Sequence, residues 1–157
     1  MYPSRKSNRL KDYDYSRAGA YFLTICAKGR LELFSRIVVR ETPCRSTVEL
    51  TDIGKIIAAE IEKFSDAYDF VTVEHYVIMP NHVHMIVLIN GGGRQNAAPT
   101  VPRMIKQWKR AVSLKVGYSI WQRSFYDHVV RNENDHREIM EYIENNPAKW
   151  DEDRYHP

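Results

Sequence analysis

The chain has few of the residues that mark export, membrane insertion or covalent cross-linking. Its 157 residues include only two cysteines, Cys26 and Cys44, too few for a disulfide scaffold or a four-cysteine zinc site. No stretch approaches the ~18 consecutive apolar residues that a membrane-spanning helix needs. The charged N-terminus is not followed by the apolar segment of a signal peptide. We therefore expect a cytoplasmic protein that does not associate with membranes.

The remaining composition is that of an ordinary globular domain, with 43% hydrophobic and 27% charged residues. A chain of this length can bury roughly 68–70% of the surface that its unfolded form exposes. The sequence therefore predicts a single domain over residues 1–157, of which residues 1–12 form a basic N-terminal arm.

The small net charge of +3 hides an uneven distribution of charge. Residues 101–126 contain six basic side chains and no acidic one, whereas residues 127–157 contain four basic and nine acidic side chains. Clustered cations indicate a polyanionic partner, although a solvated surface explains any one cluster about as well. The cations singled out by this pattern are Arg5, Lys6, Arg9 and Lys11 in the arm and Lys106, Lys109, Arg110 and Lys115 in the acid-free block.

Short apolar, β-branched runs alternate with amphipathic segments along the chain. Strands are predicted at 20–26, 70–79, 82–89 and 125–131, with a small hairpin within 33–50; helices are predicted after Thr51, from Pro102 to Gly117 and from about 134 to 146. Runs 70–79 and 82–89 should pair across the Pro80-Asn81 turn. This order predicts an α+β fold in which helices pack on an antiparallel sheet.

The ends of the last helix carry their own signals. Asp135 and Glu138 have the spacing of a capping box, which places the helix start near Asp135. Pro147 should end the helix, because a proline disfavours the α conformation in the residue before it.

Two histidines begin the second strand of the predicted hairpin. Side chains at i and i+2 of a strand share a face, so His82 and His84 should project together while Val83 points into the opposite layer. Two neutral imidazoles can bind a metal ion, but two hydrogen-bonded core histidines would have the same spacing. An unpartnered histidine is costly to bury in so apolar a hairpin, which favours a site. We expect no cysteine nearby, so oxygen or nitrogen ligands would complete a Mg²⁺ or Mn²⁺ site.

Tyr142 and Asn146 lie one turn apart on the last predicted helix and therefore share one face. Taken alone, a tyrosine at such a position is more often a packing residue than a chemical one.

Four segments of the chain resemble one family. Residues 76–84, Tyr-Val-Ile-Met-Pro-Asn-His-Val-His, resemble the histidine–hydrophobic–histidine signature of single-tyrosine HUH transposases. Residues 141–147, Glu-Tyr-Ile-Glu-Asn-Asn-Pro, resemble the tyrosine helix of the branch called REP-associated tyrosine transposases. Residues 121–132 and 13–26 are similar to the same branch, so the resemblance spans residues 13 to 150 in the order of the family.

The resemblance implies a ferredoxin-like antiparallel sheet of the HUH endonuclease type. It also implies that His82, His84 and Asn146 hold one divalent metal ion, Mg²⁺ or Mn²⁺. Tyr142 would attack a phosphodiester of single-stranded DNA and form a 5′-phosphotyrosine. The whole chain would then be one catalytic domain that nicks and rejoins hairpin DNA, associated with the bacterial nucleoid through that DNA.

On this interpretation the basic arm and the basic block contact DNA, and Tyr118, Trp121 and Phe125 are candidates for stacking on unpaired bases, although Phe125 fits a core position at least as well. We expect the block to lie on a helix beside the site. A monomer and a homodimer both remain possible. A DNA-hairpin-binding repressor without catalysis is the main alternative; a metallohydrolase of small substrates is the other, and it would leave the basic block without a purpose.

Overall fold

The computed structural model describes residues 12–14, 17–40, 45–91 and 99–157. The predicted contacts of Arg5, Lys6, Arg9 and Lys11 fall outside these residues. Within the described ranges, no helix is both long enough and apolar enough to cross a membrane.

The main sheet has four strands in the spatial order β4-β5-β1-β6, and all neighbours are antiparallel. These strands are β1 (Gly19–Cys26), β4 (Val71–Ile78), β5 (His82–Ile89) and β6 (Tyr126–Val129). Helices intervene between β1 and β4 and between β5 and β6, which gives the β-α-β-β-α-β order of a ferredoxin-like fold. The predicted α+β fold and its ferredoxin-like sheet are thus confirmed.

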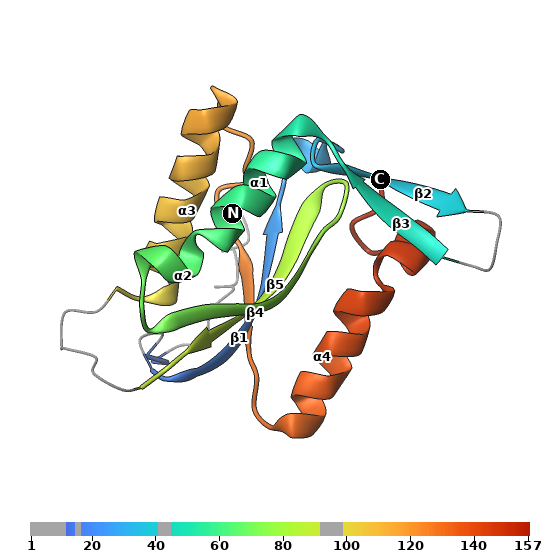
Figure 1. The fold of residues 1–157 in the computed structure, drawn as a ribbon. Helices are drawn as coiled ribbons and strands as arrows, with labels where there is room; N and C mark the ends of the chain where they lie inside the picture. Colours follow the sequence, from blue (N-terminus) through green and yellow to red (C-terminus); the bar gives the residue numbers. More distant parts are fainter. Residues whose placement is uncertain (1–11, 15–16, 41–44, 92–98) are drawn as a thin grey trace, which may run out of the picture.

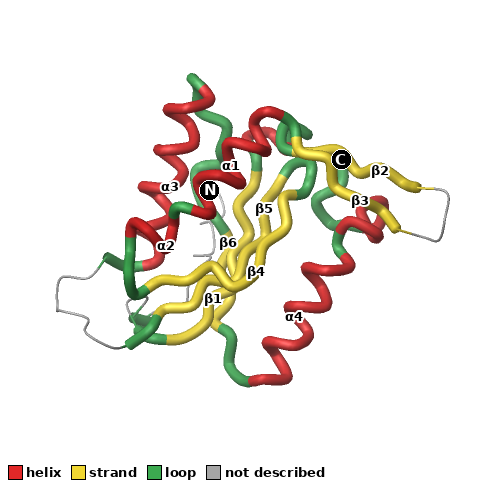
Figure 2. Tube along the Cα trace, viewed as in Figure 1, coloured by secondary structure: helices red, strands yellow, loops and turns green. Residues whose placement is uncertain are grey.

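Helices cover both faces of this sheet (Figure 1). The helices are α1 (Asp52–Glu62), α2 (Phe64–Ala67), α3 (Val101–Val116) and α4 (Glu133–Asn145). α1, α2 and α3 contribute to the larger core on one face, whereas α4 packs alone on the other (Figure 2). The α4 face is the one that carries the candidate site.

Alternation along the strands decides which side chain meets which layer. Leu23 of β1 and Met85 of β5 are fully buried in the core beneath α1 and α3. Their neighbours in sequence point the other way: Phe22 and Ile86 pack in the smaller cluster with Ile143 of α4. In each of these strands, every second residue therefore lies in the larger core, and the residues between them lie on the α4 face.

Caps fix the start of α1 and the end of α3 at Thr51 and Gly117, where the sequence predicts these helix ends. The Thr51 hydroxyl accepts a hydrogen bond from the Gly54 amide at 3.1 Å at the start of α1. Gly117 ends α3 with φ of 96°, in the left-handed region that glycine adopts without strain.

The last helix lies where predicted and ends before Pro147, but the signals at its two ends differ from those expected. Asn132 is the N-cap, and its side chain accepts from the Asp135 amide at 2.9 Å, so Asp135 does not itself start a capping box with Glu138. Asn146 keeps α conformation (φ −58°, ψ −44°) even though Pro147 follows. The chain continues into a 3₁₀ segment, η2 (Pro147–Glu152), because a proline in the first turn of a helix lacks only an N–H that has no helical partner there.

A second, two-stranded sheet lies beside η2. The hairpin predicted within 33–50 is present as β2 (Ser35–Arg40) and β3 (Arg45–Leu50). A short 3₁₀ turn, η1 (Lys28–Arg30), joins β1 to this hairpin, and β3 contacts η2. These contacts bring the end of the chain back toward β1 and β5.

Candidate metal and nucleophile site

The two histidines start β5 on the α4 face of the sheet, as the strand period predicts. Their ring centroids are 4.5 Å apart, and both side chains are buried. Val83, between them, lies in the larger core on the opposite face.

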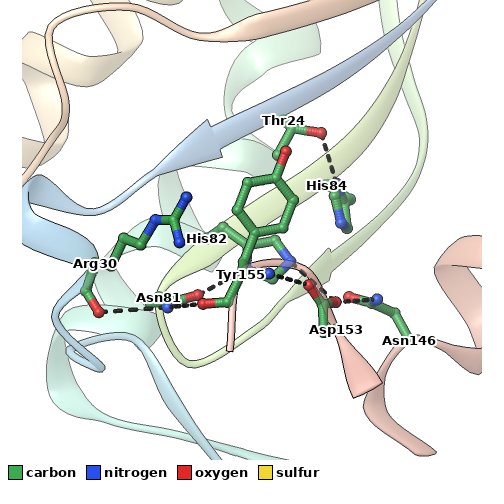
Figure 3. A network of polar contacts seen from close by, with 8 residues as sticks. All are labelled: Thr24, Arg30, Asn81, His82, His84, Asn146, Asp153 and Tyr155. Atoms are coloured by element: carbon green, nitrogen blue, oxygen red, sulfur yellow. Dashed lines mark hydrogen bonds and ion pairs between the residues drawn. The ribbon is translucent and has the colours of Figure 1, made fainter. Parts of the chain in front are cut away.

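Asn81 fixes the orientation of His82. Its amide nitrogen donates to the carbonyl oxygens of Tyr155 (2.7 Å) and Arg30 (3.3 Å), so its Oδ1 is the atom that faces His82 Nδ1 at 2.8 Å (Figure 3). Because Oδ1 can only accept, the proton of the neutral ring lies on Nδ1. The lone pair of His82 is therefore on Nε2, on the side of the ring away from Asn81.

His84 is held in a similar way from β1. Thr24 is paired directly with His84, and its hydroxyl lies 2.8 Å from His84 Nδ1, which leaves Nε2 as the second ring nitrogen (Figure 3). Burial lowers the pKa of His82 to about 4, against the raising effect of the Asp153 carboxylate. Burial, and next the neighbouring His82, lower the pKa of His84 well below its usual value. Both rings are thus neutral at pH 7, the form that can bind a cation.

Asn146 and Asp153 approach the histidines from the C-terminal segment. Asn146, at the end of α4, is buried and donates from Nδ2 to Asp153 Oδ2 at 2.6 Å (Figure 3). The Asp153 side chain has no exposed surface, and its Oδ2 lies 3.9 Å from His82 Nε2. Its Oδ1 accepts from the Tyr155 amide at 2.7 Å. The sharp η2 segment after Pro147 is what brings this carboxylate back to the site.

Three buried ligand-type atoms at this point have no hydrogen-bond partner among the described residues: His82 Nε2, His84 Nε2 and Asn146 Oδ1. The possible ligand atoms of His82, His84 and Asp153 all lie within 4.8 Å of one another. A buried polar atom without a partner costs about 1–3 kcal/mol, so three of them facing one carboxylate are well explained by a bound cation. The residues present therefore fit a divalent metal ion.

Tyr142 lies one turn before Asn146 and beside the histidines. Its ring centroid is 5.2 Å from that of His84 and 6.2 Å from that of Phe22, and 42% of the residue is exposed. Burial raises the pKa of the hydroxyl, and the Asp153 charge raises it further. The phenol is therefore protonated at neutral pH and would need help to act as a nucleophile.

Aromatic residues of the C-terminal segment cover the histidine pair. The Tyr155 ring centroid lies 4.6 Å from that of His82, and the Trp150 centroid lies 6.0 Å from it. Burial raises the pKa of Tyr155 to about 12, so this second tyrosine is harder to ionise than a free one.

The expectation that no cysteine lies near the histidines is wrong. Cys26 is paired directly with His82 across β1 and β5. It is absent from the group of candidate ligands, and burial raises the pKa of its thiol to about 11. The candidate ligand atoms that lie together at this point are therefore nitrogen and oxygen atoms.

The helix that carries Lys106, Lys109, Arg110 and Lys115 does not lie on the face of the site. α3 packs against α1 in the core on the other face of the sheet. Lys109 Nζ donates to the carbonyl oxygens of Gln122 (2.7 Å) and Ser124 (3.0 Å), and Lys115 pairs with Glu60. Lys106 and Arg110 are exposed. DNA contacts by these four cations stay a prediction, and two of the four have structural partners.

Two of the three aromatic residues predicted to stack on bases are core residues. Trp121 and Phe125 are buried in the larger core, whereas Tyr118 is 56% exposed. The first two cannot reach a base without unfolding part of that core.

Sequence reasoning missed the supporting residues Asn81, Thr24 and Asp153. The sequence pattern identifies Asn81 only as a turn residue, although its place directly before His82 is a usable signal. Thr24 and Asp153 could not be assigned, because their distances from the histidines depend on strand register and on the path of the chain after Pro147.

Comparison with known proteins places the chain. No protein-family model matches it. It is 30% identical to an uncharacterized protein of Haemophilus influenzae, over 96% of this chain and 92% of that protein. A second H. influenzae protein, provisionally named as a REP-associated tyrosine transposase, is 23% identical over 87% of this chain and 74% of its own length. The REP-associated tyrosine transposase of Escherichia coli is 32% identical over 49% of this chain and 44% of that protein.

One solved structure is similar to this chain in fold. It is that of a REP-associated tyrosine transposase bound to a REP hairpin, with a TM-score of 0.65 and 22% identity over 90% of this chain and 74% of that chain. The ferredoxin-like sheet, with two histidines facing a helix tyrosine, is the arrangement that the resemblance to the class of single-tyrosine HUH transposases implies. Within that class, the chain belongs to the family of REP-associated tyrosine transposases.

Proposed function

We propose that this chain is a metal-dependent transposase that nicks and rejoins single-stranded DNA at a hairpin, with Tyr142 as the nucleophile. The observation that supports it most is the meeting of three partnerless buried atoms, on His82, His84 and Asn146, next to the Tyr142 ring. The family, and the REP hairpin bound by the neighbouring structure, support hairpin DNA as the substrate.

The metal would be held by His82 Nε2, His84 Nε2 and Asn146 Oδ1, with Asp153 as a further oxygen donor. Two nitrogen and two oxygen donors suit Mn²⁺, and Mg²⁺ if water completes the shell. When bound, the cation would polarise the scissile phosphodiester and offset the negative charge that builds on its non-bridging oxygens.

The proposed reaction then replaces one phosphoester bond with another. Tyr142 Oη attacks phosphorus and loses its proton, the bond from phosphorus to O3′ breaks, and O3′ takes up a proton. The products are a 5′-phosphotyrosine and a free 3′-hydroxyl. Because the phosphoester is retained, attack by another 3′-hydroxyl can rejoin DNA without ATP.

The test is the formation of a covalent adduct. Wild-type protein is incubated with an end-labelled DNA hairpin carrying single-stranded flanks, with Mn²⁺, Mg²⁺ or EDTA, and resolved on a denaturing gel. We expect a labelled protein band with metal, none with EDTA, and none for Tyr142→Phe. Tyr118→Phe is the matched control, because it removes the hydroxyl of another exposed tyrosine.

The other outcomes separate the alternatives. Cleavage that survives Tyr142→Phe would identify water as the nucleophile and overturn the proposal. Hairpin binding without cleavage, with every metal and every flank length, would favour a DNA-binding repressor that keeps the fold.

A further inference from the structure

Tyr126 lies at the open end of a row of side chains that leads to the histidine site. It is paired directly with Thr24 of β1, and Thr24 is paired on its other side with His84. Directly opposed residues in antiparallel strands project to the same face, so Tyr126, Thr24 and His84 share the α4 face. β6 is an edge strand, and Tyr126 is 45% exposed.

Arg154 lies against this tyrosine. Its guanidinium carbon is 5.9 Å from the Tyr126 ring centroid and 5.1 Å from the Tyr155 ring centroid. Two aromatic rings therefore orient a planar cation. Arg154 is exposed, and it forms no ion pair with any carboxylate in the described ranges.

The surroundings make this unpaired cation unusual. Arg154 and Tyr142 both line an open hollow of about 470 Å³ along α4 and η2. The other charged residues lining this hollow are Glu138, Glu141, Lys149, Glu152 and Asp153. A guanidinium near so many carboxylates commonly pairs with one of them, whereas Arg154 lies against the rings of Tyr126 and Tyr155.

The charge of Arg154 reaches the reacting groups. Burial and Asp153 raise the pKa of Tyr142, and the Arg154 charge acts in the opposite direction. An acidic hollow repels a DNA strand, so a phosphodiester brought to Tyr142 needs fixed positive charge there. Arg154 is placed to supply part of it.

We infer that Arg154 binds a phosphate of single-stranded DNA at the Tyr142 site, and that Tyr126 is the positioning residue that holds its guanidinium. The inference rests on the proposed function, because it takes the same DNA strand as its ligand. The guanidinium can donate two parallel hydrogen bonds to non-bridging oxygens, which a lysine cannot do.

The test measures DNA binding apart from cleavage. A fluorescent single-stranded oligonucleotide is titrated with protein in EDTA at several salt concentrations and followed by anisotropy. We expect Arg154→Gln to weaken binding about tenfold or more and to reduce the salt slope by ~0.7. Arg154→Lys should keep the slope and recover only part of the affinity.

Tyr126 and a distant lysine provide the controls. Tyr126→Phe keeps the ring and should bind like the wild type, whereas Tyr126→Ala should weaken binding severalfold. Lys55→Gln removes an exposed charge from α1, on the other face of the sheet, and should change affinity less than twofold. Equal losses for Arg154→Gln and Lys55→Gln would overturn the inference, because net charge alone would then explain both. Should Arg154→Gln not fold, Arg154→Lys and Tyr126→Ala carry the same comparison.

Parallel adduct assays separate this inference from the proposed function. If wild-type protein forms the adduct and Arg154→Gln binds and reacts equally well, the phosphate site is wrong and the transposase proposal stands. If wild-type protein forms no adduct but Arg154→Gln still loses affinity and salt slope, the nucleophile proposal fails and the phosphate site stands.

Discussion

The two faces of the main sheet differ in what their inward-pointing residues do. Beneath α1 and α3 the strands contribute a continuous apolar core that includes Leu23, Ile25 and Met85. Beneath α4 the same strands contribute a small apolar cluster at one end and the buried histidines at the other. The larger buried cluster lies on the first face, and the partnerless polar atoms lie on the second.

The strongest test of this division compares neighbouring residues on opposite faces. His84→Ala should lower Mn²⁺ affinity by at least about 100-fold, since even the loss of a partner of a ligand costs 10–100-fold. Met85→Ala should keep metal affinity but cost about 2–5 kcal/mol of unfolding free energy, because it leaves a cavity in a closed core. Calorimetric Mn²⁺ titration and urea unfolding measure the two effects.

Two results would contradict this division between a metal-binding face and a stabilising face. If His84→Ala protein binds Mn²⁺ with normal affinity, the metal does not bind at the histidine site. A Met85→Ala protein that loses metal affinity while remaining folded would show that the two faces are coupled through β5.

The second prediction concerns Asn81, which supports the ligand without being one. Asn81→Ala removes the acceptor of the His82 Nδ1 proton, so the ring can rotate or change tautomer. Mn²⁺ affinity should fall about 10- to 100-fold, less than for His84→Ala. Asn81→Asp restores the acceptor but loses the donor to the Tyr155 and Arg30 carbonyl oxygens, so it should recover only part of the affinity. Equal losses for both variants would mean that Asn81 acts only through its contacts to the backbone.

The parts of the site that the sequence could predict are those that depend on local patterns. Alternation in residues 82–89 was enough to place both histidines on one face, because the period of a strand is local information. Thr24 and Asp153 depend on register and on the η2 turn, which sequence patterns do not specify. The helix of the basic block is expected beside the site, but α3 packs on the other face of the sheet. Helix periodicity shows which residues are buried but not which side of the sheet buries them.

The third prediction uses the pKa of His82. Burial lowers the folded-state pKa to about 4 from the model-compound value of 6.5, so between these pH values the unfolded chain binds more protons than the folded one. Without metal, the protonation of His82 alone should therefore lower the unfolding free energy by about 2 kcal/mol between pH 7 and pH 5. His84, whose pKa burial also lowers, should add to this fall. Urea unfolding in EDTA measures it, and His82→Asn should flatten part of the dependence.

The smallest expected effect is that of Lys115, and it tests whether this cation of α3 stabilises the fold or contacts DNA. Its pairing with the largely buried Glu60, whose pKa it lowers, indicates a structural task. Lys115→Gln should lower the urea midpoint slightly, by less than Met85→Ala, because Lys63 still lies 3.3 Å from Glu60. It should leave the binding of a short single strand unchanged, because α3 and Tyr142 lie on opposite faces of the sheet.

Lys106→Gln, which removes an exposed charge from the same helix, should leave the midpoint unchanged. A Lys115→Gln protein with an unchanged midpoint and a salt slope reduced by ~0.7 would instead make Lys115 a phosphate contact, and DNA would then have to reach both faces of the sheet.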